Sequence, residues 1–357
     1  MSNIPTTKSP HTFAKFTTTQ GARIYRLPLE AFHNFWVYAY LVFVDDQIVL
    51  IDTGSGSGES NRCLLDGFER VQTEEGLASV LDSLTHILIT HGHIDHFGGL
   101  PFLIEQTNAK VGIHELDLRN LTNFEERIMV SERRLRDFLI EAGVDAEKRE
   151  EIVRVYMINK LLSKSVPVDF TYSAINMQLG RFEFLHVPGH SAGHVAIRLD
   201  DYIFCGDHVL NGISPHQWPE RLTLNMGLGH YLDSLSKFDA WAAEKNVTLV
   251  LSGHNEPVSD LSARIQQIKG IHAQRLERAL GILSEPHTVA EVSSQLFRKV
   301  SGYDILLSVE EAGAHVEYLY QRGLLGIANI NEIELGNVPL LYQRLNDPIA
   351  EQMRICC

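Results

Sequence analysis

The segment LITHGHIDHFGG, at residues 88–99, constrains the fold more than any other part of the chain. It gathers three histidines and one aspartate within six positions, namely His91, His93, Asp95 and His96. In a regular strand or helix these side chains would point in different directions, whereas a loop leaving a buried strand can turn them toward one point. The glycines of the segment allow the tight turns that such a loop needs. The segment predicts a metal-binding loop, and a cluster of surface histidines is the alternative.

The segments around this loop predict strands and helices in alternation. Two apolar runs, at residues 36–44 and 47–52, predict a hairpin with a tight turn at Asp45-Asp46. Apolar periodicity predicts three further elements: a helix over about 59–84, a strand over 85–90 and a helix over about 99–106. The histidine loop is therefore expected between a strand and a helix.

Three later segments also place a metal-binding side chain just after an apolar strand and a glycine. They are HVPGHSAGHVAIRL with His190, YIFCGDHV with Asp207 and VTLVLSGHNEP with His254. Other histidines share this neighbourhood, but such residues are more often outer-sphere or surface groups than ligands. They are His186, His194, His208, His216 and His230.

Together these motifs resemble those of the metallo-β-lactamase superfamily, and within it the glyoxalase-II-like hydrolases. The matching segments occur in the family's order: IDTG (51–54), THGHIDHFGG (90–99), PGHSAGH (188–194), GDH (206–208) and SGH (252–254). The resemblance implies an α+β fold, the four-layer αββα sandwich, with two mixed sheets face to face and helices outside. It also implies the ligands of two metal ions: His91, His93 and His190 for the first, Asp95, His96 and His254 for the second, with Asp207 bridging them.

The donor set agrees with hydrolytic chemistry. Nitrogen and carboxylate donors without thiolates suit zinc, our first choice, and also iron or manganese. Two ions about 3.5 to 4 Å apart can share a hydroxide and polarise the bond that it attacks, so Asp95 and Asp207 are the candidate catalytic residues. No G-x-S-x-G nucleophile motif is present. Asp52 is expected outside the ligand set, as a carboxylate that fixes a ligating histidine.

The length of 357 residues exceeds the about 250 to 300 residues at which single cores stop growing, so we expect two domains. Residues 1–260 would form the metallo-β-lactamase-like domain, with residues 115–162 inserted as a helical cap over the cleft. A solvated helical decoration without a part in binding is the alternative for the insertion. Residues 261–357 are expected to form a helical linker and a winged-helix-like domain, similar to the appendage of some superfamily hydrolases.

This second domain is predicted from three helical segments followed by a small hairpin. They lie at residues 261–283, 287–300, 308–325 and 327–345. The third helix, in the recognition position of a winged helix, carries Glu310, Glu311 and Glu317 against one late Arg322. These charges and the net charge of −14 disfavour nucleic acid, so a structural or homodimer-forming role is expected.

The substrate is the least constrained expectation. The segment GDHVLNGISPHQWPERLTLNMGLGHY lacks the glutathione-specific pattern of glyoxalase II and resembles a broader subgroup that acts on thioesters, esters, lactones or phosphodiesters. The candidate pocket residues in it are His216, Trp218, Arg221, His230 and Tyr231, and local folding explains each equally well. The main hypothesis is a dinuclear hydrolase of small carbonyl substrates, thioesters first. A metal-dependent endoribonuclease or phosphodiesterase, a non-enzymatic regulator and redox or sulfur chemistry remain as alternatives.

The expected location is the cytoplasm. The longest apolar run, at residues 36–44, is shorter than the about 20 residues of a membrane-spanning helix, and no secretory leader opens the chain. Four cysteines fit no disulfide framework. The terminal Cys356-Cys357 pair is read as a frayed tail rather than a lipidation site.

Overall fold

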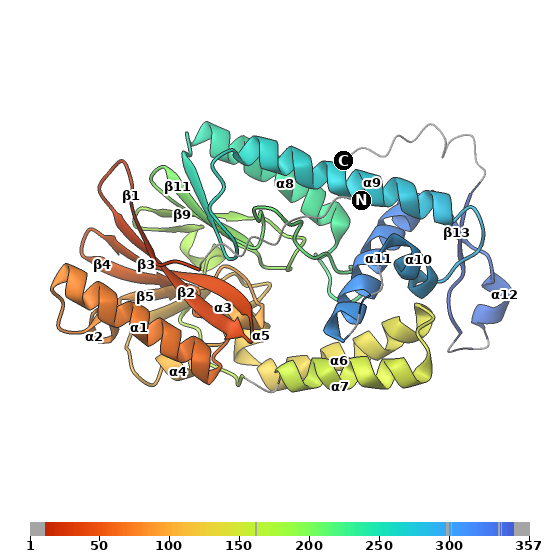
Figure 1. Ribbon diagram of the computed structural model, residues 1–357, viewed down its shortest axis with the longest axis horizontal. Helices are drawn as coiled ribbons and strands as arrows, with labels where there is room; N and C mark the ends of the chain where they lie inside the picture. The colour runs from red at the N-terminus through yellow and green to blue at the C-terminus, as the bar shows by residue number, and fades with distance from the viewer. Residues whose placement is uncertain are drawn as a thin grey trace.

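The computed structural model describes residues 11–160, 163–297, 300, 302–334, 336 and 338–345. Two sheets face each other in the half of the molecule that holds the N-terminal strands, and long helices make up the other half (Figure 1). The predicted tail at Cys356-Cys357 lies outside the described residues. No helix in the described part of the chain is long and apolar enough to cross a membrane.

The first sheet has seven strands in sequence order. They are β1 (Ala14–Thr17), β2 (Arg23–Phe32), β3 (Phe35–Val44), β4 (Gln47–Ile51), β5 (His86–Leu88), β6 (Lys110–Ile113) and β7 (Phe170–Thr171). The pairs from β1 to β4 are antiparallel, and those from β4 to β7 are parallel. The predicted hairpin is confirmed by the pairing of β3 with β4, which turns at Asp45 with a positive φ of 52°.

The second sheet has five strands in the order β12-β11-β10-β9-β8. They are β8 (Gln178–Leu179), β9 (Phe182–His186), β10 (Val195–Leu199), β11 (Tyr202–Gly206) and β12 (Leu249–Ser252). Only the pair of β11 with β12 is parallel. Both sheets are thus mixed, as the αββα sandwich requires.

Strand β3 explains why the chain needs two apolar layers. Its side chains alternate between two clusters: Tyr38, Tyr40 and Val42 pack between the sheets, while Val37, Ala39, Leu41 and Phe43 pack toward α1 (Gly58–Glu75). Successive side chains of a strand point to opposite faces, so a strand covered on both sides reads as an unbroken apolar run.

The helices next to the metal-binding loop are shorter than predicted. The helix expected over 59–84 is wrong in its length: α1 ends at Gly76, whose left-handed conformation (φ 67°) terminates it, and α2 (Val80–Ser83) is separate. The helix expected over 99–106 is the single turn α4 (Leu100–Leu103). The loop itself contains a helical turn, α3 (Ile94–Phe97), which carries two of the candidate ligands.

The inserted segment is helical, with α5 (Leu118–Thr122), α6 (Phe124–Glu141) and α7 (Ala146–Lys160). It is not a solvated decoration, because its apolar side chains join the core of the C-terminal helices. Phe138 and Tyr156, for example, share one hydrophobic cluster with Leu306 and Val309. The short element η1 (Ser173–Ile175) and the long helix α8 (Leu228–Glu244) complete the region before residue 260.

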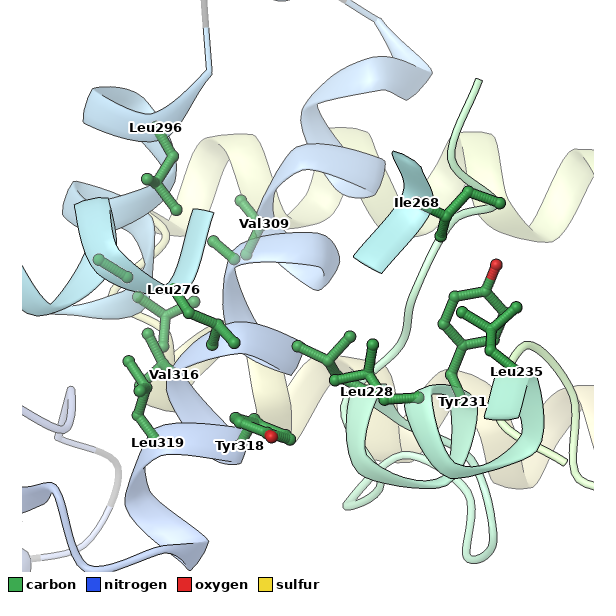
Figure 2. Packing of buried hydrophobic residues seen from close by; sticks show 14 of the residues in the cluster. Leu228, Tyr231, Leu235, Ile268, Leu276, Leu296, Val309, Val316, Tyr318 and Leu319 are labelled. Atoms are coloured by element: carbon green, nitrogen blue, oxygen red, sulfur yellow. The ribbon is translucent and has the colours of Figure 1, made fainter. Parts of the chain in front are cut away.

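The C-terminal segment follows the predicted order of three helices and a two-stranded sheet. Its elements are α9 (Leu261–Ile282), α10 (Val289–Leu296), α11 (Tyr303–Gln321), β13 (Leu325–Ile327), α12 (Ile330–Ile333) and β14 (Tyr342–Arg344). The hairpin differs from the prediction, because α12 separates its strands. Side chains of α8, α9, α10 and α11 interlock in one cluster (Figure 2), and the division at residue 260 stays a prediction.

The acidic residues of α11 lie on the predicted helix, but they do not face solvent as their expected effect on nucleic-acid binding requires. Glu310 is fully buried, Glu311 is 6 % exposed, and Glu317 accepts hydrogen bonds from the backbone of Glu220 and Arg221. The interpretation of these residues as an exposed acidic recognition surface is therefore wrong. The helix is buried on nearly every side, which an amphipathic reading of its sequence does not reveal.

Candidate metal centre

The structure brings all seven candidate ligands to one edge of the two sheets. They form two groups in which the donor atoms lie within 4.8 Å of one another: His91, His93 and His190 in one, Asp95, His96, Asp207 and His254 in the other. The loops that carry them follow β5, β9, β11 and β12. Strand ends at one edge of a sandwich thus supply donors from distant parts of the chain.

Asp207 lies between the two groups. Its Oδ1 is 3.4 Å from His96 Nε2, and its Oδ2 is 3.2 Å from His254 Nε2 and 3.8 Å from His190 Nε2. Asp95 Oδ2 completes the second group, at 3.3 Å from His254 Nε2 and 3.6 Å from His96 Nε2. Asp207 therefore lies near nitrogen donors of both groups.

The buried atoms of this centre fit metal ions. His91 Nε2, His96 Nε2, His190 Nε2 and Asp207 Oδ1 have no hydrogen-bond partner among the described residues. Buried polar atoms of folded proteins nearly always have partners, so four such atoms facing one another need a common one. Divalent cations accept imidazole nitrogen and carboxylate oxygen together.

The local charge also favours a cation. Burial by itself lowers the pKa of His254, but the Asp207 and Asp95 carboxylates outweigh it and raise that pKa to about 10. The same carboxylates and Asp52 raise the pKa of His96, against its burial. The two aspartates therefore make this end of the centre a place that stabilises positive charge.

Three candidate ligands are oriented by hydrogen bonds from Nδ1. His96 Nδ1 lies 2.8 Å from Asp52 Oδ2, His190 Nδ1 lies 2.9 Å from the His216 carbonyl oxygen, and His254 Nδ1 lies 2.6 Å from the Trp36 carbonyl oxygen. Each Nδ1–H can only donate to these oxygens. The Nε2 lone pair is then left for a metal ion.

Asp52 occupies the position expected of an orienting carboxylate. Besides its contact with His96, it accepts a hydrogen bond from the backbone N–H of Thr90 (2.8 Å) and another from the Thr90 hydroxyl (2.7 Å). The residue is 2 % exposed and holds a left-handed conformation with φ 58°. Such strain persists where the surrounding contacts enforce it, as they do here.

Asp117 is a residue of this region that the sequence analysis missed. Its Oδ2 accepts hydrogen bonds from the backbone N–H of Gly92 and from the Ser191 hydroxyl, both at 2.8 Å, and it is 2 % exposed. It joins the loop of His91 to the loop of His190. The signal was present, because Asp117 closely follows the apolar strand β6, but the residue was assigned to the helical insertion.

The five candidate pocket residues have different surroundings. The Trp218 ring lies 6.0 Å from the His93 ring, beside the first group. Arg221 forms an ion pair with Glu141 of α6, and His230 lies 3.0 Å from a carboxylate oxygen of Glu220. Neither of them is brought to the metal centre by these contacts.

Tyr231 is placed in the core rather than in a pocket. It is fully buried, and its hydroxyl donates to the His208 carbonyl oxygen at 2.9 Å. The pocket prediction for this residue is therefore wrong, and the reason is that the start of α8 packs inward under the loop of Gly189.

The fifth candidate, His216, faces two acidic side chains of α11, Glu310 and Glu311. Its Nε2 is 3.4 Å from Glu310 Oε2, and its Nδ1 is 3.3 Å from Glu311 Oε2. Burial lowers the pKa of His216, but the hydrogen bonds to the two carboxylates raise it to about 9. The ring is half-buried and lies between the two acids.

A third set of metal-compatible side chains lies next to this cluster: His272, Glu311 and His315. Hydrogen bonds link its members, and His272 Nε2 has no hydrogen-bond partner among the described residues. His315 Nδ1 lies 2.7 Å from the Glu311 carbonyl oxygen and therefore donates, so its Nε2 accepts from His272 Nδ1 at 3.1 Å. Arg275 balances the charge of the Glu311 carboxylate at 2.7 Å.

Comparisons with known proteins agree with this architecture. The chain is 24% identical over 295 residues to the "Probable metallo-hydrolase YqjP" of Bacillus subtilis, which covers 79% of this chain and 87% of that protein. It is also 24% identical over 184 residues to a hydroxyacylglutathione hydrolase of Shewanella baltica, over 52% of this chain and 51% of that enzyme. The chain thus matches about half the length of the latter relative.

A solved structure shares the fold over nearly the whole chain. It is a metallo-beta-lactamase family protein from Thermus thermophilus, with a TM-score of 0.67 and 24% identity, covering 90% of this chain and 98% of that one. The model of the family described as "Metallo-beta-lactamase superfamily" matches residues 37–254, which include all seven candidate ligands. The chain therefore belongs to the metallo-β-lactamase superfamily.

Proposed function

We propose that this protein is a dinuclear metal-dependent hydrolase of small carbonyl compounds, with thioesters first and esters or lactones next. The observation that carries the proposal is the convergence of seven buried or half-buried donors on one point, with Asp207 between two groups. Two divalent ions held there would lower the pKa of a water that they share and polarise the bond that it attacks. Zinc is the first choice for this nitrogen and carboxylate set, and iron or manganese would also fit.

The chain itself supplies hydrogen bonds that orient the candidate ligands, a carboxylate that can accept a proton, and aromatic side chains beside the two groups. The Nδ1 hydrogen bonds hold three ligands in place before any substrate arrives. Asp95 is half-buried in the second group and is the carboxylate available to take a proton from the attacking water. This role stays part of the proposal.

Aromatic side chains beside both metal groups support a small organic substrate. Phe35 is 46% exposed and its ring lies 4.9 Å from the His254 ring, while Trp218 lies beside His93 at the other group. Aromatic faces on both sides of the metal groups favour binding of an acyl or thioester chain over a hydrated polyanion. The hydrolase names of the relatives point in the same direction.

The C-terminal helices and hairpin are proposed to serve as a structural winged-helix-like module. Their side chains share a core with the cap and with α8, which supports a role in holding the active-site loops. The acids of α11 face this core, so their charge no longer bears on nucleic-acid binding. A nuclease is therefore tested directly rather than argued from charge.

The test is a substrate panel on the metal-loaded, full-length protein, at low and moderate salt. We expect hydrolysis of at least one thioester, ester or lactone, loss of that activity with a chelator, and little effect of salt. Metal-dependent cleavage of single-stranded RNA that falls steeply with salt, with every carbonyl substrate left intact, would overturn the proposal, because affinity for phosphate backbones depends strongly on salt.

A further inference from the structure

The buried charges around His216 are costly and need a reason. Taking an ion out of water is unfavourable, and the cost is offset only by close partners. Glu310 and His216 come from segments 94 residues apart in the chain, and the fully buried Glu310 carboxylate meets the half-buried His216 ring. The helix α11 thus holds one loop of the catalytic region by its charges.

The same helix also holds the backbone of that loop. Glu311 Oε2 accepts a hydrogen bond from the backbone N–H of Gln217 at 2.8 Å, and Arg275 bridges Glu311 to the Ser214 hydroxyl. A β-carbon added at Gly313 would lie 2.9 Å from Pro219 Cγ. A glycine destabilises a helix relative to alanine, and the close approach of the loop and of Phe138 Cζ, at 2.8 Å, explains its presence.

The loop in turn orients a candidate metal ligand. The carbonyl oxygen of His216 is the acceptor 2.9 Å from His190 Nδ1. Its side chain also lies beside Trp218, with 4.9 Å between the ring centroids. The orientation of His190 therefore depends on the backbone carbonyl of His216, and the side chain of His216 is held by α11.

We propose that Glu310 and Glu311 are positioning residues for the first metal site, because through His216 they hold the carbonyl group that orients His190. This inference rests on the metal-binding part of the proposed function and on no particular substrate. With this role, the helix α11 supports the metal centre and is more than an appendage to the sandwich.

The test is metal affinity, measured by competition with a coloured chelator for zinc or cobalt alone. His190→Ala and His254→Ala serve as reference variants. Each removes a candidate ligand of one group, and so identifies the affinity that belongs to that group. Glu310→Gln keeps the shape of the side chain and removes its charge. We expect this variant to bind about 10-fold more weakly the ion that is lost in His190→Ala. The ion that His254→Ala loses should keep its affinity.

A matched control lies on the same helix. Glu317→Gln removes a half-buried acid that contacts the loop at residues 220 and 221, beyond the link to His190, and should leave both affinities unchanged. Glu311→Gln removes the second acid that faces His216, and His216→Gln removes the ring that both acids face, so a folding failure of one variant leaves two others. Circular dichroism verifies which of them fold.

The outcomes separate this inference from the proposed function. If the parent protein binds two ions and any folded variant of the His216 cluster binds both as tightly, the inference is overturned and the hydrolase proposal stands. Equal weakening of both ions would also overturn it, since that result indicates general loosening. A parent that takes up fewer than two ions would overturn both.

Discussion

Replacing Asp207 by alanine is expected to lower metal-dependent turnover by at least about 100-fold and to loosen both ions. The physical reason is the position of its two oxygens, which face His96 on one side and His254 and His190 on the other. Without this carboxylate, the buried nitrogen donors of the two groups lose the negative charge that they share. The measurements are kcat/KM on the best substrate of the panel and metal content after gel filtration.

The control is Asp201→Ala, which removes a carboxylate just before the opposite end of the same strand, β11. Asp201 accepts hydrogen bonds from the backbone of Thr19 and from the Thr248 hydroxyl, far along the strand from the metal centre. Its loss should leave turnover and metal content unchanged. Near-native turnover of Asp207→Ala with both ions retained would refute the bridging assignment.

Gly253→Ala is expected to have an effect of similar size, about 100-fold on turnover, by displacing the ligands rather than removing one. A β-carbon at this position would lie 2.5 Å from Asp207 Oδ1 and 2.6 Å from His96 Cε1, closer than real β-carbons come to other atoms. Both neighbours are candidate ligands fixed by further contacts, so neither can move without opening the second group. Loss of one ion should accompany the loss of turnover.

Gly270→Ala provides the matched control for this prediction. Gly270 lies within α9, and a β-carbon there meets nothing within 4 Å. Alanine in a helix interior stabilises by about 1 kcal/mol relative to glycine, so this variant should keep its activity and melt at the same or a higher temperature. If both alanine variants behave alike, the steric account of Gly253 is wrong.

The convergence of the candidate ligands was predictable because the information for it is local. Each candidate ligand lies just after an apolar strand, in a short motif, and loops at one edge of a sandwich converge. The hairpin of β3 and β4 was predictable for the same reason, since its apolar runs and its turn are contiguous. The end of α1 was missed because Gly76 stands within a stretch whose apolar spacing continues past it.

The surroundings of the ligands were not predictable, because they depend on partners far apart in the chain. Asp117 contacts the loops of Gly92 and Ser191, and Glu310 reaches His216 from the C-terminal segment. Residue spacing shows that an acid lies on a helix, but not that the helix is enclosed. The charges of α11 were therefore read as surface charges, although Glu310 and Glu311 are buried and face His216.

The most direct test of the account is the metal content of the purified protein after expression with added zinc, iron or manganese. Elemental analysis should give about two transition-metal ions per chain, and one ion per chain for His190→Ala and for His254→Ala. Less than one ion per chain in the parent, with no uptake when the metals are titrated in, would contradict the dinuclear centre on which the proposed hydrolysis depends.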